Sequence, residues 1–271
     1  ADENQTTIGT VSASDPENAT VTYEITDGTS VISIDSSTGA LVFDSAPNYE
    51  VKSRYPPAGD DSESYIVSVS DGTNTTTQSL TLVIADVNDA PTFTSESTFS
   101  IQENTTSAIG TVVASDEDSD DVTFSSISGS EINISSDGLL TFVTTPDYET
   151  KTSYSATVTI SDGTDSATQD ITVNITDENE RPAFTSSATF SAAENQTSIG
   201  TVTATDPEGL TVRFSLSSDT GLQITSGGVL TFVSTPDYET KNTYTATVFA
   251  NDPAENTKTQ SITVNVIDVD D

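Results

Sequence analysis

The chain has 271 residues and a net charge of −36, because 43 Asp and Glu stand against 7 Lys and Arg. Such a chain repels the phosphates of nucleic acids and anionic lipids, so we expect neither as a partner. The absence of Cys excludes disulfides and thiol chemistry. The absence of His excludes the usual zinc and copper sites, a histidine general base and Ser-His-Asp catalysis.

No apolar run is long enough to cross a bilayer, and no signal peptide is visible, so we expect no direct membrane insertion. The chain starts almost on its first acidic motif and stops within its last one. We interpret it as a fragment of a longer tandem array. The lack of Cys and the richness in Ser, Thr and Asp favour a bacterial surface or secreted protein.

Alternating apolar and polar residues run through the whole chain, a pattern typical of strands with one buried face. In chain order the apolar positions are Val21, Tyr23 and Ile25; Leu41 and Phe43; Val67 and Val69; Leu80, Leu82 and Ile84; Leu140 and Phe142; Val158 and Ile160; Ile171, Val173 and Ile175; Leu230 and Phe232; Val248 and Ala250; and Ile262, Val264 and Val266. Gly and Asp between them predict turns, and no segment predicts a helix.

The pattern repeats. Glu-Asn pairs begin at Glu3, Glu103 and Glu194, which lie 100 and 91 residues apart, the size of a small domain. We therefore predict an all-β chain of three tandem Greek-key β-sandwich domains, immunoglobulin-like in class and arranged as an elongated rod. The predicted domains are residues 1–89, 90–181 and 182–271. The first lacks its opening strand, which predicts an incomplete sheet edge, and carries a turn-rich insertion near 54–63.

Acidic residues recur at the same five landmarks of each predicted domain. The landmarks are the Glu-Asn pair, an acidic turn after a short strand, an (Asn/Asp)-Tyr-Glu triplet, an Asp at a strand end and an acidic linker. Because strand ends of a sandwich gather at its poles, the linkers should lie among acids from both neighbouring domains. Calcium takes six to eight oxygen ligands, so the pattern predicts a repeated calcium site.

These motifs resemble the cadherin repeat family. The resemblance rests on Glu103-Asn104, Gly110-Thr111-Val112, Ala114-Ser-Asp116-Glu-Asp118, Asp147-Tyr148-Glu149, Asp162-Gly163 and the linker Asp86-Val87-Asn88-Asp89-Ala90-Pro91-Thr92-Phe93. It covers nearly the whole chain. It implies that calcium is held between successive domains. At the first junction the implied ligands are Glu3, Asn48, Glu50, Asp86, the Val87 carbonyl, Asn88, Asp89, the Ala90 carbonyl, Asp116, Asp118 and Asp162.

The resemblance implies a second junction and a C-terminal half-site. The second junction takes Glu103, Asp147, Glu149, Asp177, Asn179, Glu180, Asp206, Glu208 and Asp252. The half-site takes Glu194, Asp237, Glu239 and Asp268. The chain departs from the family pattern, because Asn48 and Glu180 replace Asp residues and Arg181 follows Glu180. Glu208 likewise replaces the second Asp of its turn. We therefore expect the second junction to bind fewer ions, or to bind them more weakly.

The implied function is calcium-dependent stiffening and extension of a cell-surface or secreted adhesion protein, without catalysis. The partners would be neighbouring cadherin-like domains of one longer chain, with a surface protein or polysaccharide as a further candidate. The alternative is a carbohydrate-binding or other ligand-binding β-sandwich module, for which Tyr55 is the one aromatic outside core-pattern positions. A glycosidase with paired carboxylates is disfavoured, because the repeat accounts for the acids and leaves no unique pair.

Overall fold

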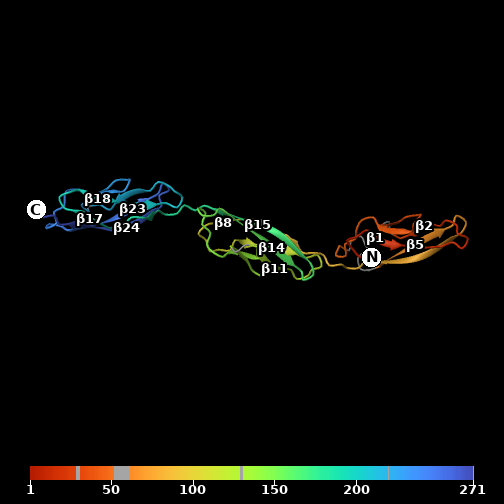
Figure 1. The fold of residues 1–271 in the computed structure, drawn as a ribbon. Helices are drawn as coiled ribbons and strands as arrows, with labels where there is room; N and C mark the ends of the chain where they lie inside the picture. The colour runs from red at the N-terminus through yellow and green to blue at the C-terminus, as the bar shows by residue number, and fades with distance from the viewer. Residues whose placement is uncertain (29–30, 52–61, 129–130, 219, 271) are drawn as a thin grey trace. The chain divides into compact units, whose positions relative to one another are not determined.

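A computed structural model describes the chain except for residues 29–30, 52–61, 129–130, 219 and 271 (Figure 1). The expected insertion near 54–63 therefore lies largely outside the described residues, and so does Tyr55. The described part of the chain contains β-strands and no helix, so the predicted all-β class is confirmed. It accordingly contains no helix long and apolar enough to span a membrane.

The strands fall into three successive sets, which follow the predicted repeats. Residues 1–89 form β1 (Thr7–Thr10), β2 (Thr22–Asp27), β3 (Ile32–Ile34), β4 (Ala40–Phe43), β5 (Ser62–Ser70) and β6 (Thr75–Val83). Residues 90–181 form β7 (Thr92–Phe93), β8 (Thr98–Gln102), β9 (Gly110–Thr111), β10 (Ala114–Ser115), β11 (Thr123–Ser128), β12 (Ile132–Ile134), β13 (Leu139–Phe142), β14 (Ser153–Ser161) and β15 (Ser166–Thr176). Residues 182–271 form β16 (Ala183–Phe184), β17 (Thr189–Ala193), β18 (Ser198–Thr201), β19 (Ala204–Thr205), β20 (Arg213–Leu216), β21 (Leu222–Ile224), β22 (Val229–Phe232), β23 (Thr243–Asn251) and β24 (Thr257–Ile267).

Each set contains two main sheets. One has three strands in the first set, in the order β2-β5-β6, and four in the later sets, in the orders β11-β14-β15-β8 and β17-β24-β23-β20. The other has three strands in every set, in the orders β1-β4-β3, β12-β13-β9 and β18-β22-β21. Within the described residues, two short ladders, β7 with β10 and β16 with β19, occur in the later sets alone. The first and last long strands of these sets pair in parallel, as in β17 with β24.

The buried faces are those that the alternation predicts. Val67, Val158 and Val248 occupy the same place in β5, β14 and β23, and each is fully buried. In the third set, Leu230 and Phe232 of β22 pack in one cluster with Val248 and Val264. Thr and Ser are common at the intervening positions, which face solvent. Period-two burial of this kind gives each sheet one inward and one solvated face.

The Glu-Asn motif marks a sharp bend in the backbone. Asn4, Asn104 and Asn195 all adopt the left-handed conformation, with φ of 58°, 55° and 59°. Asn tolerates this region better than most residues. Each Asn N–H then donates to the carbonyl of a proline that precedes the (Asn/Asp)-Tyr-Glu triplet: Pro47, Pro146 and Pro236. The bend therefore carries the preceding Glu into the region of that triplet.

The chain divides into two compact units, which we describe separately. Unit 1 comprises Ala1–Ser97, Gly110–Leu140 and Ala156–Ile171, and unit 2 comprises Thr98–Ile109, Thr141–Ser155 and Thr172–Asp271. The linker at residues 86–90 lies wholly within unit 1, and the linker at 177–181 wholly within unit 2. The repeat boundaries at 89 and 181 remain a proposal.

Candidate metal centres

A buried glutamate belongs to three of the five carboxylate groups in the described part of the chain. Glu3, Glu103 and Glu194 are 3%, 1% and 4% exposed. In unit 2, the Glu103 carboxylate accepts the backbone N–H groups of Tyr148 and Glu178, both at 2.8 Å. Glu194 accepts those of Tyr238 at 2.8 Å and Val269 at 2.9 Å. Each glutamate thus ties its triplet to the strand exit that follows, while its carboxylate also faces the neighbouring acids.

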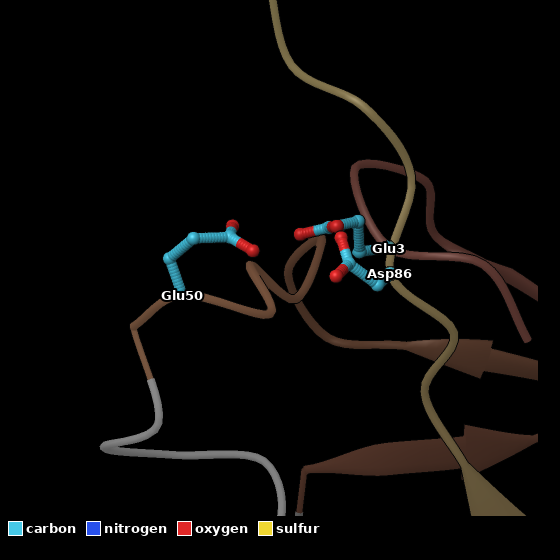
Figure 2. A group of neighbouring side chains, drawn as sticks. All are labelled: Glu3, Glu50 and Asp86. Carbon is cyan, nitrogen blue, oxygen red and sulfur yellow. The ribbon is translucent and has the colours of Figure 1, made fainter. Parts of the chain in front are cut away.

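In unit 1, Glu3 makes the same pair of contacts and meets two further acids. Its carboxylate accepts the N–H of Tyr49, and the N–H of Val87 at 2.9 Å. Carboxylate oxygens of Glu3, Glu50 and Asp86 lie within 4.8 Å of one another. Figure 2 shows the Glu50 side chain reaching from its loop toward the other two. The Val87 amide makes this contact, and the Val87 carbonyl stays a predicted calcium ligand.

Glu50 also belongs to a second group, with Asp89 and Glu117, again within 4.8 Å. Glu117 was missed by the sequence analysis, which chose its neighbours Asp116 and Asp118. The signal was present, since Glu117 is the middle acid of the Asp116-Glu117-Asp118 turn. The Asn48 amide donates to Glu117 at 3.0 Å, and its own oxygen accepts the Val51 N–H at 2.7 Å. Asn48 therefore holds the Glu117 carboxylate in place through a hydrogen bond.

The first linker is held by acids of residues 110–140 and 156–171, all within unit 1. Asp89 donates its N–H to Asp118 at 2.6 Å. The Asn88 amide donates to Asp162 at 3.0 Å and to Asp165 at 2.9 Å. Asp165 was not predicted as a site residue. The hydrogen bond from Asn88 and those from the Thr164 and Asp165 amides lower the pKa of Asp162.

In unit 2, the second linker makes a related but different set of contacts. Carboxylates of Glu149, Asp177 and Glu208 form one group, and those of Glu103, Asp147 and Glu149 another. Glu180 donates its N–H to Glu208 at 2.9 Å, and the Asn179 amide donates to Asp252 at 2.6 Å. Asn256, a neutral residue, contacts this linker through the Asn179 carbonyl at 2.9 Å. The corresponding side chain on the first linker is the charged Asp165.

The C-terminal half-site is simpler. Glu194, Asp237 and Glu239 form one group within 4.8 Å. Asp268 is not part of this group, and its role as a further ligand stays a prediction. The Thr240 hydroxyl and backbone N–H donate to Asp237 and lower its pKa.

The carboxylates of these groups repel one another, and this repulsion raises the pKa of several of them. Burial, together with the neighbouring acids, raises the pKa of Glu50, Asp89, Glu149 and Asp206. The same influences raise the pKa of Asp86. The facing Glu208 carboxyl, followed by burial, raises the pKa of Glu180 to about 7. Like charges that cannot separate favour the protonated form, and a divalent cation would remove that penalty.

Carboxylate oxygens that lack hydrogen-bond partners are a second reason why these groups suit a hard cation such as calcium. Several buried carboxylate oxygens have no hydrogen-bond partner among the described residues: Glu50 Oε2, Asp89 Oδ2 and Asp116 Oδ2 in unit 1, and Glu180 Oε2, Asp206 Oδ2 and Glu208 Oε2 in unit 2. Buried polar atoms normally find partners, so each of these requires an explanation such as an ion. Oxygen-only sites suit calcium or magnesium rather than zinc.

Sequence comparisons find similarity between this chain and cadherins. It is 31% identical to human cadherin EGF LAG seven-pass G-type receptor 1 over 220 residues, which cover 71% of this chain and 7% of that protein. It is 32% identical to the mouse receptor 2 over 228 residues, covering 73% of this chain and 8% of that protein. The chain is cadherin-like. It spans less than a tenth of the length of these curated relatives.

Solved structures share this cadherin-like fold. Mouse cadherin-23 EC22-24 gives a TM-score of 0.58 at 24% identity, covering 99% of this chain and 95% of that chain. Protocadherin gamma B2 domains 3-6 give 0.60 at 21% identity, covering 100% and 71%. Residues 88–176 also match the family described as bacterial Ig domain. A further relative is chitinase A of Pseudoalteromonas piscicida, 36% identical over 107 residues, covering 38% of this chain and 13% of that protein.

Proposed function

We propose that these cadherin-like repeats bind calcium at their linkers and use it to stiffen and extend a cell-surface or secreted adhesion protein. The observation that carries the proposal is the group of Glu50, Asp89 and Glu117 in unit 1. Its oxygens converge within 4.8 Å, and both Glu50 Oε2 and Asp89 Oδ2 are buried without a hydrogen-bond partner among the described residues. Calcium would supply the missing contacts and neutralise the group.

At the first linker, we add two residues to the ligands that the sequence predicted. From the first repeat and its linker come Glu3, Asn48, Glu50, Asp86, the Val87 carbonyl, Asn88, Asp89 and the Ala90 carbonyl, and from the second repeat come Asp116, Asp118 and Asp162. Glu117 is added as a ligand because its carboxylate shares a group with Glu50 and Asp89. Asp165 is added as a nearby charge that attracts the cation.

At the second linker, the proposed ligands are those predicted: Glu103, Asp147, Glu149, Asp177, Asn179, Glu180, Asp206, Glu208 and Asp252. We propose weaker binding here than at the first linker. Arg181 adds a positive charge next to Glu180, and Asn256 is neutral where the first linker meets Asp165. Fewer net negative charges lower the affinity of an oxygen site for calcium.

Stiffening follows from shared ligands. Without a cation, clustered carboxylates repel one another, and a linker held only by hydrogen bonds can open. With calcium, oxygens from two repeats and the linker coordinate the same ions and hold one orientation. The proposed role is therefore structural and extracellular, with the neighbouring repeats of the same chain as partners.

Small-angle X-ray scattering of the whole chain tests the proposal. Addition of calcium to chelator-treated protein should increase both the radius of gyration and the maximum dimension of the chain. Sodium chloride at equal ionic strength is the control for simple charge screening. Identical scattering curves with calcium and with chelator would contradict the stiffening role, and calorimetry on the same samples would show whether binding itself had failed.

A carbohydrate-associated role is the second candidate, because the chitinase A relative shares 36% identity over 107 residues. Sugar-binding surfaces usually present exposed aromatic rings, whereas the exposed large hydrophobic residues of the described part of the chain are all Val, Leu or Ile. A chitin pull-down with calcium present separates the two candidates. Retention of the chain on chitin at micromolar concentration would favour the carbohydrate role.

A further inference from the structure

The Asn of the Glu-Asn motif contacts the last acid of the linker that follows its repeat. In unit 1, the Asn4 side-chain amide donates to Asp89 Oδ1 at 3.0 Å, across 85 residues of sequence. In unit 2, the Asn104 side-chain amide donates to Glu180 Oε1, across 76 residues. The same contact therefore forms twice, once with the shorter acid and once with the longer one.

The left-handed bend at these two positions does not by itself explain the choice of Asn. The backbone φ is 58° at Asn4 and 55° at Asn104, a conformation that glycine adopts at less cost. A glycine would also keep the backbone N–H that donates to the proline carbonyl before the triplet. What Asn adds is a side-chain donor that can reach the linker acid.

Each of these hydrogen bonds leaves the second oxygen of the acid free for another contact. Asp89 Oδ2 and Glu180 Oε2 are buried and have no hydrogen-bond partner among the described residues. Asp89 is also the linker member of the carboxylate group that contains Glu50 and Glu117. The amide of Asn4 thus fixes one oxygen of Asp89 and leaves the other available to a cation.

The last linker acid is held a second time, through its backbone. Asp89 donates its N–H to Asp118 at 2.6 Å, within unit 1. Glu180 donates its N–H to Glu208 at 2.9 Å, within unit 2. Its carboxylate is held by an Asn that precedes it in the sequence and its N–H by an acid that follows it. The linker is therefore ordered by hydrogen bonds that involve no cation.

The Asn amides also act on the charge of these acids. Burial raises the pKa of Asp89, and the hydrogen bond from Asn4 opposes that rise. The Glu208 carboxyl and burial raise the pKa of Glu180, and the hydrogen bond from Asn104 opposes that rise. A donor aimed at a carboxylate favours its ionised form, which is the form that binds a cation.

We propose that Asn4 and Asn104 are positioning residues for calcium, each holding the last acid of its linker in the ligand position before the cation binds. Because that side chain is already ordered in the calcium-free chain, less conformational freedom is lost on binding. Neither Asn is itself a ligand. The effect on affinity rests on the proposed function, whereas the order of the calcium-free linker can be measured without metal.

The test replaces Asn4 by Gly in the whole chain, which removes the amide and keeps the left-handed bend. Asn18→Gly is the matched control, because Asn18 has φ of 63°, is exposed and lies outside the linker. In chelator, hydrogen exchange at the Asp89 amide should become roughly three- to ten-fold faster in Asn4→Gly alone, the effect of one lost hydrogen bond. Calorimetry should show calcium binding at the first linker weakened by a similar factor.

A double-variant comparison separates positioning from a general structural role. In an Asp89→Ala background, Asn4→Gly should change calcium affinity by less than about two-fold, because the acid that Asn4 positions is absent. An undiminished effect of Asn4→Gly in that background would overturn the proposal. Asn104→Gly, followed at the Glu180 amide, repeats the exchange measurement at the second linker.

Failure of this proposal is distinguishable from failure of the proposed function. Calcium binding in the unmodified chain, with equal exchange at the Asp89 amide in Asn4→Gly and Asn18→Gly, would contradict the positioning role alone. Absence of calcium binding in the unmodified chain would contradict the proposed function and the positioning role together.

Discussion

The Glu103 carboxylate accepts the backbone N–H of Tyr148 at 2.8 Å, across 45 residues of sequence. With its second hydrogen bond, to the Glu178 amide, it links the triplet turn to the linker that follows. Glu103 therefore serves folding as well as the proposed metal binding, and the two roles can be separated by measuring stability without calcium.

Replacement of Glu103 by Ala should destabilise the chain in chelator by roughly 1–3 kcal/mol, because two backbone donors lose a buried acceptor. Urea unfolding measures this change. Glu178→Ala is the matched control, since the Glu178 side chain is exposed and only its amide contacts Glu103. Equal stability of the two variants would show that the buried glutamate acts only as a ligand.

Replacement of Glu50 by Gln should weaken calcium binding at the first linker by about ten-fold or more, because Glu50 belongs to two carboxylate groups. Isothermal calorimetry on the whole chain follows the loss of one class of sites. Glu24→Gln removes the same charge from an exposed position on β2 and should leave that class unchanged. An equal loss in both variants would mean that only net charge matters.

Replacement of Arg181 by Ala should strengthen binding at the second linker by roughly two- to five-fold, the effect of one exposed charge. Terbium luminescence titration reports the change, and Arg213→Ala on β20 controls for a general gain in negative charge. Tighter binding at the second linker than at the first in the unmodified chain would contradict the proposed order of affinities.

Stability without calcium should fall as the pH rises from about 5 to 7. The folded-state pKa of Glu180 is raised to about 7, so the folded chain holds a proton that the unfolded chain has already released. The contribution of Glu180 to folding stability is complete below its pKa in the unfolded chain. It is lost as the pH rises through its pKa in the folded chain. The raised pKa values of Glu50 and Asp206 act in the same direction. Thermal melts in chelator at pH 5, 6, 7 and 8 check this.

Two controls sharpen the pH experiment. Glu180→Gln should flatten the dependence above pH 5. Saturating calcium should reverse it, because metal binding competes with protons for the same oxygens. Stability that increases between pH 5 and 7 in chelator would show that the acid clusters are not under electrostatic strain.

Replacement of Gly138 by Ala should destabilise the second repeat by about 1–3 kcal/mol. Gly138 has φ of 78°, and an added Cβ would lie 2.2 Å from the Val112 carbonyl oxygen. Gly163→Ala is the matched control, because its φ of 103° imposes strain but nothing lies within 4 Å of the added atom. Denaturant unfolding should therefore show the larger loss for Gly138→Ala.

The sequence predicted the fold class well because strand alternation is a local signal. Val158 and Val248 are fully buried at positions that the period alone identified. The acidic landmarks were equally visible, but their pairings were not. Glu117 was missed because its side chain joins Glu50 and Asp89 through contacts between residues far apart in the sequence.

The parallel pairing of β17 with β24 has a mechanical consequence. These strands open and close the third repeat, so a pull on its two ends would load five residue pairs in shear, all at once rather than one after another. Forced unfolding is governed by the unfolding rate, and simultaneous rupture slows it. In single-molecule stretching the third repeat should therefore resist a high force before it unfolds.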